Sequence, residues 1–187
     1  MKSVLISIQP KWCELIASGK KTVEVRKTKP KLETPFKVYI YCTKGEAIYH
    51  PRDIFGNKAL NGKVIGEFVC DRIDYVRNYG DCVDSYDCIA SCLSANEIIE
   101  YATDKDGNFV YTYGWHISDL VIYDKPKELR EFFQYCGDNP KCDGCEAHYF
   151  SNTECGKEDY CCSIVDGCKP LKRPPQSWCY VEELKGE

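Results

Sequence analysis

The first 27 residues constrain the fold more than any other part of the sequence, because the hydrophobic period changes twice within them. Residues 2–8 alternate apolar and polar side chains, which predicts a strand with one buried face. Residues 10–18 then place apolar side chains at helical spacing after a proline, and Gly19 is suited to end that helix. Residues 21–27 return to alternation. The segment therefore predicts a strand, a short helix and a second strand in close succession.

Strands outnumber helices in the rest of the predicted fold. Alternating or β-branched stretches predict strands, and helical spacing predicts helices. The predicted strands are residues 36–43, 64–76, 109–123 and 177–181, and the predicted helices are residues 86–102, with a capping box at Ser94 and Glu97, and residues 126–133. Six strands mixed with two or three short helices predict an α+β fold built on a partly closed β-barrel. The length of 187 residues predicts one domain, residues 1–187.

The sequence predicts no membrane-spanning segment and no secretory signal. No apolar run approaches the roughly 20 residues that cross a bilayer. The N-terminal apolar stretch is short and has no small-residue cleavage site. We therefore expect a cytoplasmic protein that does not bind membranes.

Charge is distributed unevenly along the chain. The net charge of −4 and the pI near 5.5 argue against non-specific binding to polyanions. Residues 1–63 nevertheless hold 13 Lys or Arg against 5 Asp or Glu. A cationic face in this region can attract phosphate, although a run of charges is also typical of a plain solvated surface.

The corner between the first helix and the second strand carries the strongest chemical motif. It reads Gly-x-Lys-x-x-Glu-x-Arg and consists of Gly19, Lys21, Glu24 and Arg26. Alternation places Glu24 and Arg26 on one face of the strand, with Lys21 at the corner. A guanidinium suits a planar anion or a base edge, and a desolvated lysine can act as nucleophile or base with a glutamate as proton partner. The alternative is a set of surface ion pairs, each contributing under about 1 kcal/mol.

The ordered set of motifs resembles the activating-signal-cointegrator homology (ASCH) domain, a branch of the PUA-like superfamily. The resemblance starts at residues 5–10 and is carried mainly by Gly19, Lys21, Glu24 and Arg26. Later pieces that match in the same order are residues 39–43, 62–66, 113–117 and 174–178. The resemblance leaves out a cysteine-rich segment, residues 136–168, which we interpret as an insertion before the last strand. It implies a PUA-like β-barrel with short flanking helices and a ligand cleft.

What the resemblance implies about function is binding of RNA or a modified nucleoside. The residues that we expect to contact the ligand are Lys20, Lys21, Glu24, Arg26, Lys27 and Trp115. Phosphates would be held by Lys20, Lys27 or Lys29. Trp115 can stack on a base, but a tryptophan on an alternating strand belongs more often to the core.

An enzyme is the first alternative function. Some small relatives that resemble this family are amidohydrolases, which remove the acetyl group from N4-acetylcytidine with a lysine, a threonine and a glutamate. The lysine matches Lys21, the threonine position holds Glu24, and Glu97 and Glu100 are the nearest glutamates by order. A nucleoside amidohydrolase using Lys21 therefore stands beside the binding module as a hypothesis.

Half of the 14 cysteines lie in the predicted insertion, residues 136–168. Cys142 and Cys145 form a Cys-x2-Cys pair, which suits a structural zinc ion. The candidates for the other two ligands are Cys136, Cys155, Cys161, Cys162, Cys168 and His148, of which we favour Cys162 and Cys168 because they would join the far end of the segment to the pair. Zinc could supply the folding energy of a segment with few aliphatic residues. Free thiols and disulfides are the alternatives, and an adaptor that docks partners through this segment is the third functional hypothesis.

Overall fold

Six strands, three α-helices and one short 3-10 helix make up the part of the chain that the computed structural model describes, residues 2–45, 60–76, 83–135 and 170–184. In chain order the elements are β1 (Lys2–Ile8), α1 (Pro10–Ala17), β2 (Val23–Arg26), β3 (Phe36–Cys42), β4 (Lys63–Tyr75), α2 (Ser85–Ser91), α3 (Ala95–Ala102), β5 (Tyr113–Lys127), η1 (Leu129–Glu131) and β6 (Trp178–Glu182). The predicted α+β class is confirmed.

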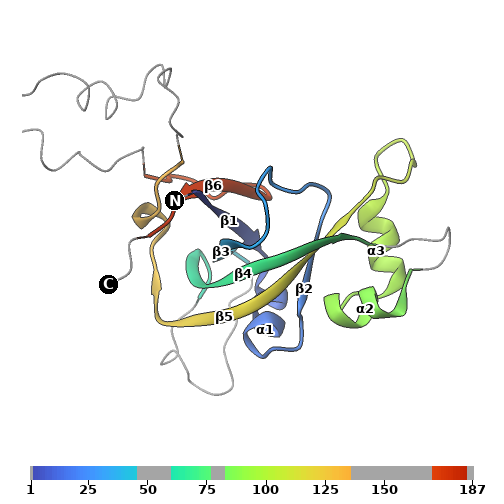
Figure 1. Ribbon diagram of the computed structural model, residues 1–187, viewed down its shortest axis with the longest axis horizontal. Helices are drawn as coiled ribbons and strands as arrows, with labels where there is room; N and C mark the ends of the chain where they lie inside the picture. The colour runs from blue at the N-terminus through green and yellow to red at the C-terminus, as the bar shows by residue number, and fades with distance from the viewer. Residues whose placement is uncertain (1, 46–59, 77–82, 136–169, 185–187) are drawn as a thin grey trace, which may run out of the picture.

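The strands form one curled sheet in the order β2-β5-β4-β3-β1-β6 (Figure 1). β1 runs parallel to β3, and the other neighbours are antiparallel. Side chains connect the two ends of the sheet. Nη2 of Arg26 in β2 donates to the carbonyl oxygen of Ser7 in β1 at 2.6 Å, and Nε1 of Trp178 in β6 donates to Oγ1 of Thr28 at 3.0 Å. The sheet is thus a half-barrel, as predicted, with hydrogen bonds across its open side.

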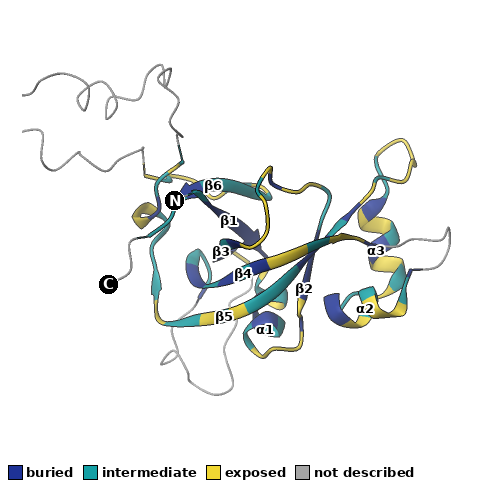
Figure 2. Ribbon diagram, viewed as in Figure 1, coloured by how far each residue is buried: buried dark blue, intermediate teal, exposed yellow. Residues whose placement is uncertain are grey.

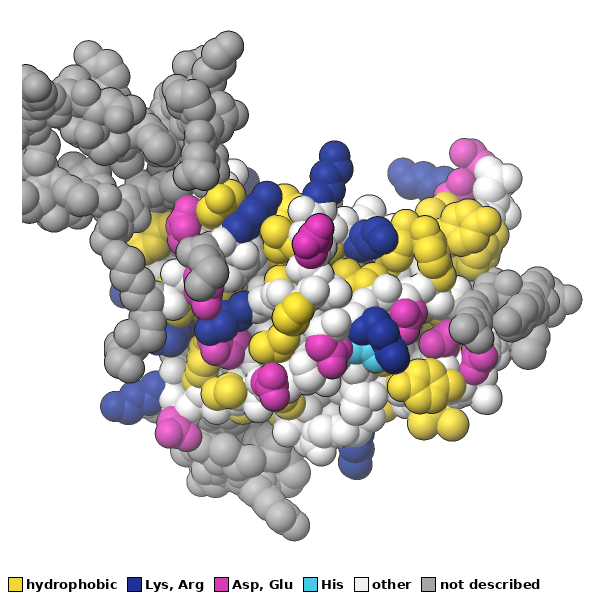
Figure 3. Space-filling view, viewed as in Figure 1, with side chains coloured by type: hydrophobic (Ala, Val, Ile, Leu, Met, Phe, Trp, Pro, Cys, Tyr) yellow, Lys and Arg dark blue, Asp and Glu magenta, His cyan; other side chains and the backbone are white. Residues whose placement is uncertain are grey.

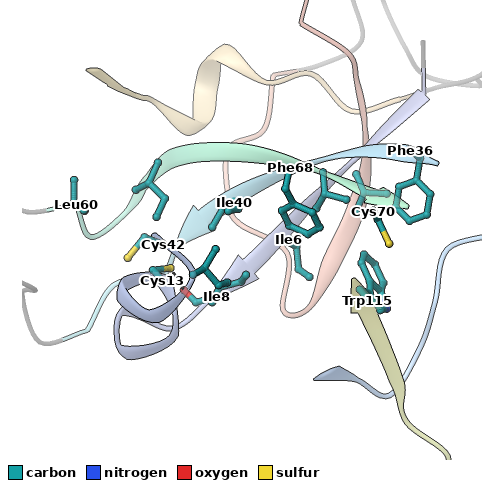
Figure 4. Close-up of a cluster of buried hydrophobic side chains, with 14 residues drawn as sticks. Ile6, Ile8, Cys13, Phe36, Ile40, Cys42, Leu60, Phe68, Cys70 and Trp115 are labelled. Atoms are coloured by element: carbon teal, nitrogen blue, oxygen red, sulfur yellow. Dashed lines mark hydrogen bonds between the residues drawn. The ribbon is translucent and has the colours of Figure 1, made fainter. Parts of the chain in front are cut away.

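The main hydrophobic core covers the inner face of this curled sheet. Ile6 of β1 pairs with Ile40 of β3, and because directly paired residues share a face, both point into the barrel. Figure 4 shows the two isoleucines in one cluster with Phe36 and Trp115, and Figure 2 shows burial concentrated on the central strands. Each fully buried side chain of this kind contributes about 1.5–3 kcal/mol. The packed core therefore holds the strands of the half-barrel, and the side chains that they carry, in fixed positions.

A second, smaller core lies behind β2. Val25 packs there with Val76, Val83 and Ile98, and the last of these comes from α3. The helices α2 and α3 lie together at this end of the sheet (Figure 1). Because Val25 points to the helices, its neighbours Glu24 and Arg26 point to the inside of the barrel. The predicted alternation of β2 is confirmed.

The region predicted to be helical, residues 86–102, is interrupted at residues 92–94, so the chain forms two helices there, and the second begins at the predicted capping box. Cys92 follows α2 with a φ of 54°, in the left-handed region, and so ends the helix. Ser94 then starts α3 through the predicted capping box. Its Oγ accepts the backbone N–H of Glu97 at 3.2 Å, and the Glu97 carboxylate accepts the backbone N–H of Ser94 at 2.8 Å.

The strand predicted over residues 109–123 is shifted in the structure, where β5 spans Tyr113–Lys127. Residues 109–112 precede β5, and the backbone N–H of Val110 donates to the carbonyl oxygen of Ala102 at the end of α3. β5 then continues through Lys127, which pairs with Val64 of β4. The helix predicted over residues 126–133 is therefore shorter in the structure: its first residues belong to β5, and only the 3-10 helix η1 follows.

Two further expectations concern other parts of the chain. The cysteine-rich segment, residues 136–168, lies outside the described residues, so its role as an insertion stays a prediction. In the described residues, every helix is too short or too polar to cross a bilayer.

Candidate ligand-binding site

A tight turn between α1 and β2 orients the Lys21 side chain towards the protein interior. Gly19 follows α1 with a φ of 71°, a conformation that suits glycine at a helix end. The backbone N–H groups of Lys20 and Lys21 then donate to the carbonyl oxygen of Leu15, at 2.9 and 3.0 Å. As a result Lys20 stays exposed, while Lys21, two residues before β2, is buried.

The structure brings Lys21, Glu24 and Arg26 together as one buried ion cluster, which we call the KER cluster. Nζ of Lys21 lies 3.3 Å from Oε2 of Glu24, and Nη2 of Arg26 lies 2.9 Å from Oε1. The exposed fractions of the three side chains are 2%, 7% and 11%. These are not the solvated surface pairs of the alternative interpretation, so their electrostatic interaction is screened much less by water and salt.

Lys21 has further partners on α1 and α2. Its ammonium donates to the carbonyl oxygen of Ser91, the last residue of α2, at 2.6 Å, and it lies 5.2 Å from the ring centroid of Trp12. A cation is favoured at the carboxyl end of a helix and over an indole ring. Burial nevertheless lowers the pKa of Lys21 from its usual value, and the Glu24 carboxylate offsets part of this change.

Two N–H donors beside the cluster have no hydrogen-bond partner in the described part of the chain. One is Nε of Arg26, whose Nη2 is already shared between Glu24 and Ser7. The other is Nε1 of Trp115, a fully buried residue that pairs directly with Glu24 across β2 and β5 and therefore shares its face of the sheet. Buried donors without acceptors are rare, and each costs about 1–3 kcal/mol. Both atoms are closed to solvent, so an oxygen atom of a guest would reach them only after neighbouring side chains move aside.

The chemistry of the KER cluster follows from its charges. When both cations are ionised they share one carboxylate, so the cluster holds an excess positive charge where little water reaches it. An anionic or carbonyl-bearing guest would stabilise that charge, and loss of a proton from Lys21 is the other way to remove it. The cluster can therefore bind a phosphate, a carboxylate or the edge of a base, or it can present a neutral amine.

The other residues of the predicted site lie at different depths. Lys20 and Lys29 are exposed, and Lys27 is half-buried with its ammonium 5.3 Å from the ring centroid of Tyr101. Trp115 belongs to the core, where its ring packs against Phe36 and Trp178. The structure thus places Trp115 in the core, as the alternative interpretation predicts.

Glu97 and Glu100, the two glutamates considered for catalysis, lie exposed on α3. The Glu97 carboxylate accepts the backbone N–H of Ser94 and pairs with Lys11 at 3.6 Å. The hydrogen bond from Ser94 lowers the pKa of Glu97. Among the described contacts of Lys21, the carboxylate partner is Glu24.

The four predicted zinc ligands, Cys142, Cys145, Cys162 and Cys168, lie outside the described residues. Within residues 2–45, 60–76, 83–135 and 170–184, no group of three or more His, Cys, Asp or Glu side chains could hold a metal ion. The zinc site therefore stays a prediction about the cysteine-rich segment.

Sequence reasoning did not find the backbone part of the site. The carbonyl oxygens of Ser7 and Ser91 contact Arg26 and Lys21, but a main-chain acceptor has no signature in a sequence. The helical spacing of residues 10–18 predicts an apolar face on α1, but it gives no sign that the Trp12 ring lies near the Lys21 ammonium.

Comparison with known proteins identifies the family of this chain. The model of the ASCH domain matches residues 6–112, which is more than half of the chain and includes the whole KER cluster. No curated protein matches the chain significantly.

Solved structures of one bacterial protein are similar to it. The crystal structure of ASCH from Zymomonas mobilis is 22% identical, with a TM-score of 0.46, over 68% of this chain and 73% of that one. A mutant of the same protein with a tyrosine replaced by phenylalanine is also 22% identical, with a TM-score of 0.46, over 69% of this chain and 77% of that one. The match of the family model to residues 6–112 shows that the chain belongs to the ASCH domain family.

Proposed function

We propose that this protein binds RNA or a nucleotide-like ligand at the KER cluster. The observation that carries the proposal is that the buried Lys21 and the half-buried Arg26 share one carboxylate, with Nε of Arg26 left without an acceptor in the described residues. A phosphate oxygen or a base carbonyl would supply the missing acceptor and balance the excess positive charge. RNA binding is also a general association of the ASCH family to which the chain belongs.

Exposed lysines next to the cluster would hold the phosphate backbone. Lys20 lies at the turn before β2, and Lys27 and Lys29 follow the end of that strand. The excess of Lys and Arg over Asp and Glu in residues 1–63 supports the same assignment. Contacts of this kind fix the orientation of a strand of RNA and carry little sequence preference.

The test is the affinity for a labelled single-stranded RNA at several salt concentrations. We expect Lys20→Ala with Lys27→Ala to weaken binding and to make the salt dependence shallower, by up to about 0.7 in the log–log slope for each lost contact. Arg26→Lys should weaken binding because a lysine has no Nε–H and no planar fork of donors. Lys63→Ala, at the far end of β4, is the matched control and should bind like the wild type. The proposal is wrong if the wild type binds no RNA at low salt, or if the Lys20, Lys27 and Arg26 variants all bind like the control.

A nucleoside amidohydrolase is the second candidate, and the lowered pKa of Lys21 favours it. A neutral Lys21 amine beside Glu24 could take a proton from water, so that hydroxide adds to the acetyl carbon; the bond between that carbon and N4 then breaks, acetate leaves, and the Lys21 ammonium returns the proton to the cytidine amino group. Incubation with N4-acetylcytidine tests this function. Release of acetate that is lost in Lys21→Met supports the enzyme, and no release at high protein concentration contradicts it.

A further inference from the structure

A row of aromatic rings lies exposed on the surface next to the KER cluster. It consists of Phe109, Tyr111, Tyr75 and Tyr113, and we call it the aromatic platform. The exposed fractions of its three outer residues are 43% for Phe109, 70% for Tyr111 and 57% for Tyr75. Such large apolar side chains gathered at one place indicate an interaction surface. Figure 3 shows hydrophobic side chains gathered on this part of the surface, with Lys or Arg side chains beside them.

The rings of the platform form a continuous series. Phe109 and Tyr111 lie with their ring centroids 6.4 Å apart, Tyr111 and Tyr75 lie 5.9 Å apart, and Tyr75 and Tyr113 lie 5.1 Å apart. Mutual contact restrains each ring, so the platform loses little conformational freedom when a ligand covers it. A restrained row of rings is suited to flat partners such as nucleobases.

Positive charge accompanies the rings. The ammonium of Lys29 lies 5.4 Å from the ring centroid of Tyr113 and 5.9 Å from that of Tyr75. The nearest acidic residue along β4, Asp74, points to the other face of the strand and pairs with Arg72 at 2.8 Å. Asp104, in the turn before Phe109, accepts the backbone N–H groups of Asp106 and Asn108. Cations interleaved with aromatic rings match a ligand that combines phosphates with bases.

The platform is continuous with the KER cluster. Tyr113 of β5 pairs directly with Arg26 on one side and with Tyr75 of β4 on the other. Directly paired residues share a face, so Arg26, Tyr113 and Tyr75 form one row across three strands. A ligand that contacts Arg26 therefore lies next to the rings of the platform.

We propose that the aromatic platform stacks on the bases of single-stranded RNA, and that it extends the site at the KER cluster to several nucleotides. The inference rests on the proposed function, since it needs an RNA ligand at Arg26. It also makes that function more specific, because bases in a duplex are already stacked on each other and are not available to the rings. The platform therefore selects single-stranded over double-stranded RNA.

The experiment compares an eight-nucleotide single-stranded RNA, its duplex and a nucleoside monophosphate as ligands. Tyr75→Leu with Tyr111→Leu removes two exposed rings, and we expect a loss of at least about fivefold in affinity for the single strand, the lower end of what base stacking contributes. Tyr75→Phe with Tyr111→Phe keeps the rings and should bind within about twofold of the wild type. Tyr86→Leu, at an exposed tyrosine of α2 outside the platform, is the matched control. The affinity for the monophosphate should be the same in all four proteins.

The outcomes separate this inference from the proposed function. If the leucine variant binds the single strand like the wild type while Arg26→Lys weakens binding, the role of the platform is wrong and the role of the KER cluster in binding is supported. If the leucine variant loses affinity while Arg26→Lys does not, the rings contact RNA without the cluster, so the proposed function and the extension of its site to the platform are both wrong. If the wild type binds the single strand and the duplex with equal affinity, the proposal that the platform stacks on bases is wrong. No binding of either RNA overturns both proposals, and binding of a peptide in place of RNA does the same.

Discussion

Glu24→Gln is the substitution that tests the electrostatics of the KER cluster most severely. The carboxylate lies 3.3 Å from the Lys21 ammonium and 2.9 Å from the Arg26 guanidinium, and glutamine would leave the two cations without an anion between them. Unit charges about 4 Å apart interact by about 4 kcal/mol at an effective dielectric constant of about 20. Removing the desolvation cost of the carboxylate returns part of this energy, so we expect the free energy of unfolding to fall by about 3–5 kcal/mol at pH 7.

The loss should shrink as the pH rises. The folded-state pKa of Lys21 is lowered, so between that value and its ordinary pKa the unfolded chain binds more protons, and stability from this group increases with pH. Glu24 raises the pKa of Lys21, so Glu24→Gln lowers it further and widens this range. The variant then gains more stability than the wild type on going from pH 7 towards pH 10, because Lys21 becomes neutral and no longer repels Arg26.

Urea unfolding at both pH values measures the effect, and thermal unfolding should show a fall of about 6–20 °C at pH 7 for a chain of this size. Asp74→Asn is the control, because it removes the same charge from an exposed pair with Arg72 and should cost no more than about 1 kcal/mol. Lys21→Met should cost less than Glu24→Gln, since Glu24 and Arg26 remain paired. A loss in Glu24→Gln below about 1 kcal/mol, or one that does not change with pH, would refute the buried cluster.

Three further predictions concern other parts of the chain. Ser94→Ala removes the capping box of α3 and should lower the free energy of unfolding by about 1 kcal/mol, measured by urea unfolding; no change would contradict the cap. Gly66→Ala should destabilise the protein more strongly, because a Cβ there would overlap the carbonyl oxygen of Val121 on β5, and an unchanged melting temperature would count against this close approach. We also propose a structural zinc ion in the cysteine-rich segment, and elemental analysis of the purified protein should find about one zinc per chain; much less than one for several chains would contradict it.

Much of the site could be predicted from the sequence because it depends on local geometry. A glycine after a helix, followed by an alternating strand, fixes the side of β2 on which Glu24 and Arg26 lie. Burial of the other face by Val25 confirms the pattern. The closing of the half-barrel by Arg26 could not be predicted, because the Ser7 carbonyl oxygen comes from a strand that is adjacent only in three dimensions.

The errors in the fold have a common cause in tertiary contacts. The break between α2 and α3 depends on the left-handed conformation of Cys92, a residue with no strong preference for it. The shift of β5 depends on its pairing with β4 as far as Lys127, which local periodicity does not reveal. The aromatic platform was not found because Tyr75 and Tyr111 are distant in the sequence and meet only through the pairing of β4 with β5.

The decisive measurement is of the Arg26 Nε–H resonance in a proton–nitrogen correlation spectrum, since this buried donor is the group that the RNA ligand should satisfy. Arg26→Lys assigns the signal by its disappearance. When single-stranded RNA is added to saturation, the account predicts that the Nε–H signal moves downfield and exchanges more slowly with water, as a donor does when it gains an acceptor. Saturable RNA binding with this resonance unchanged, and with shifts confined to exposed residues, would contradict the account.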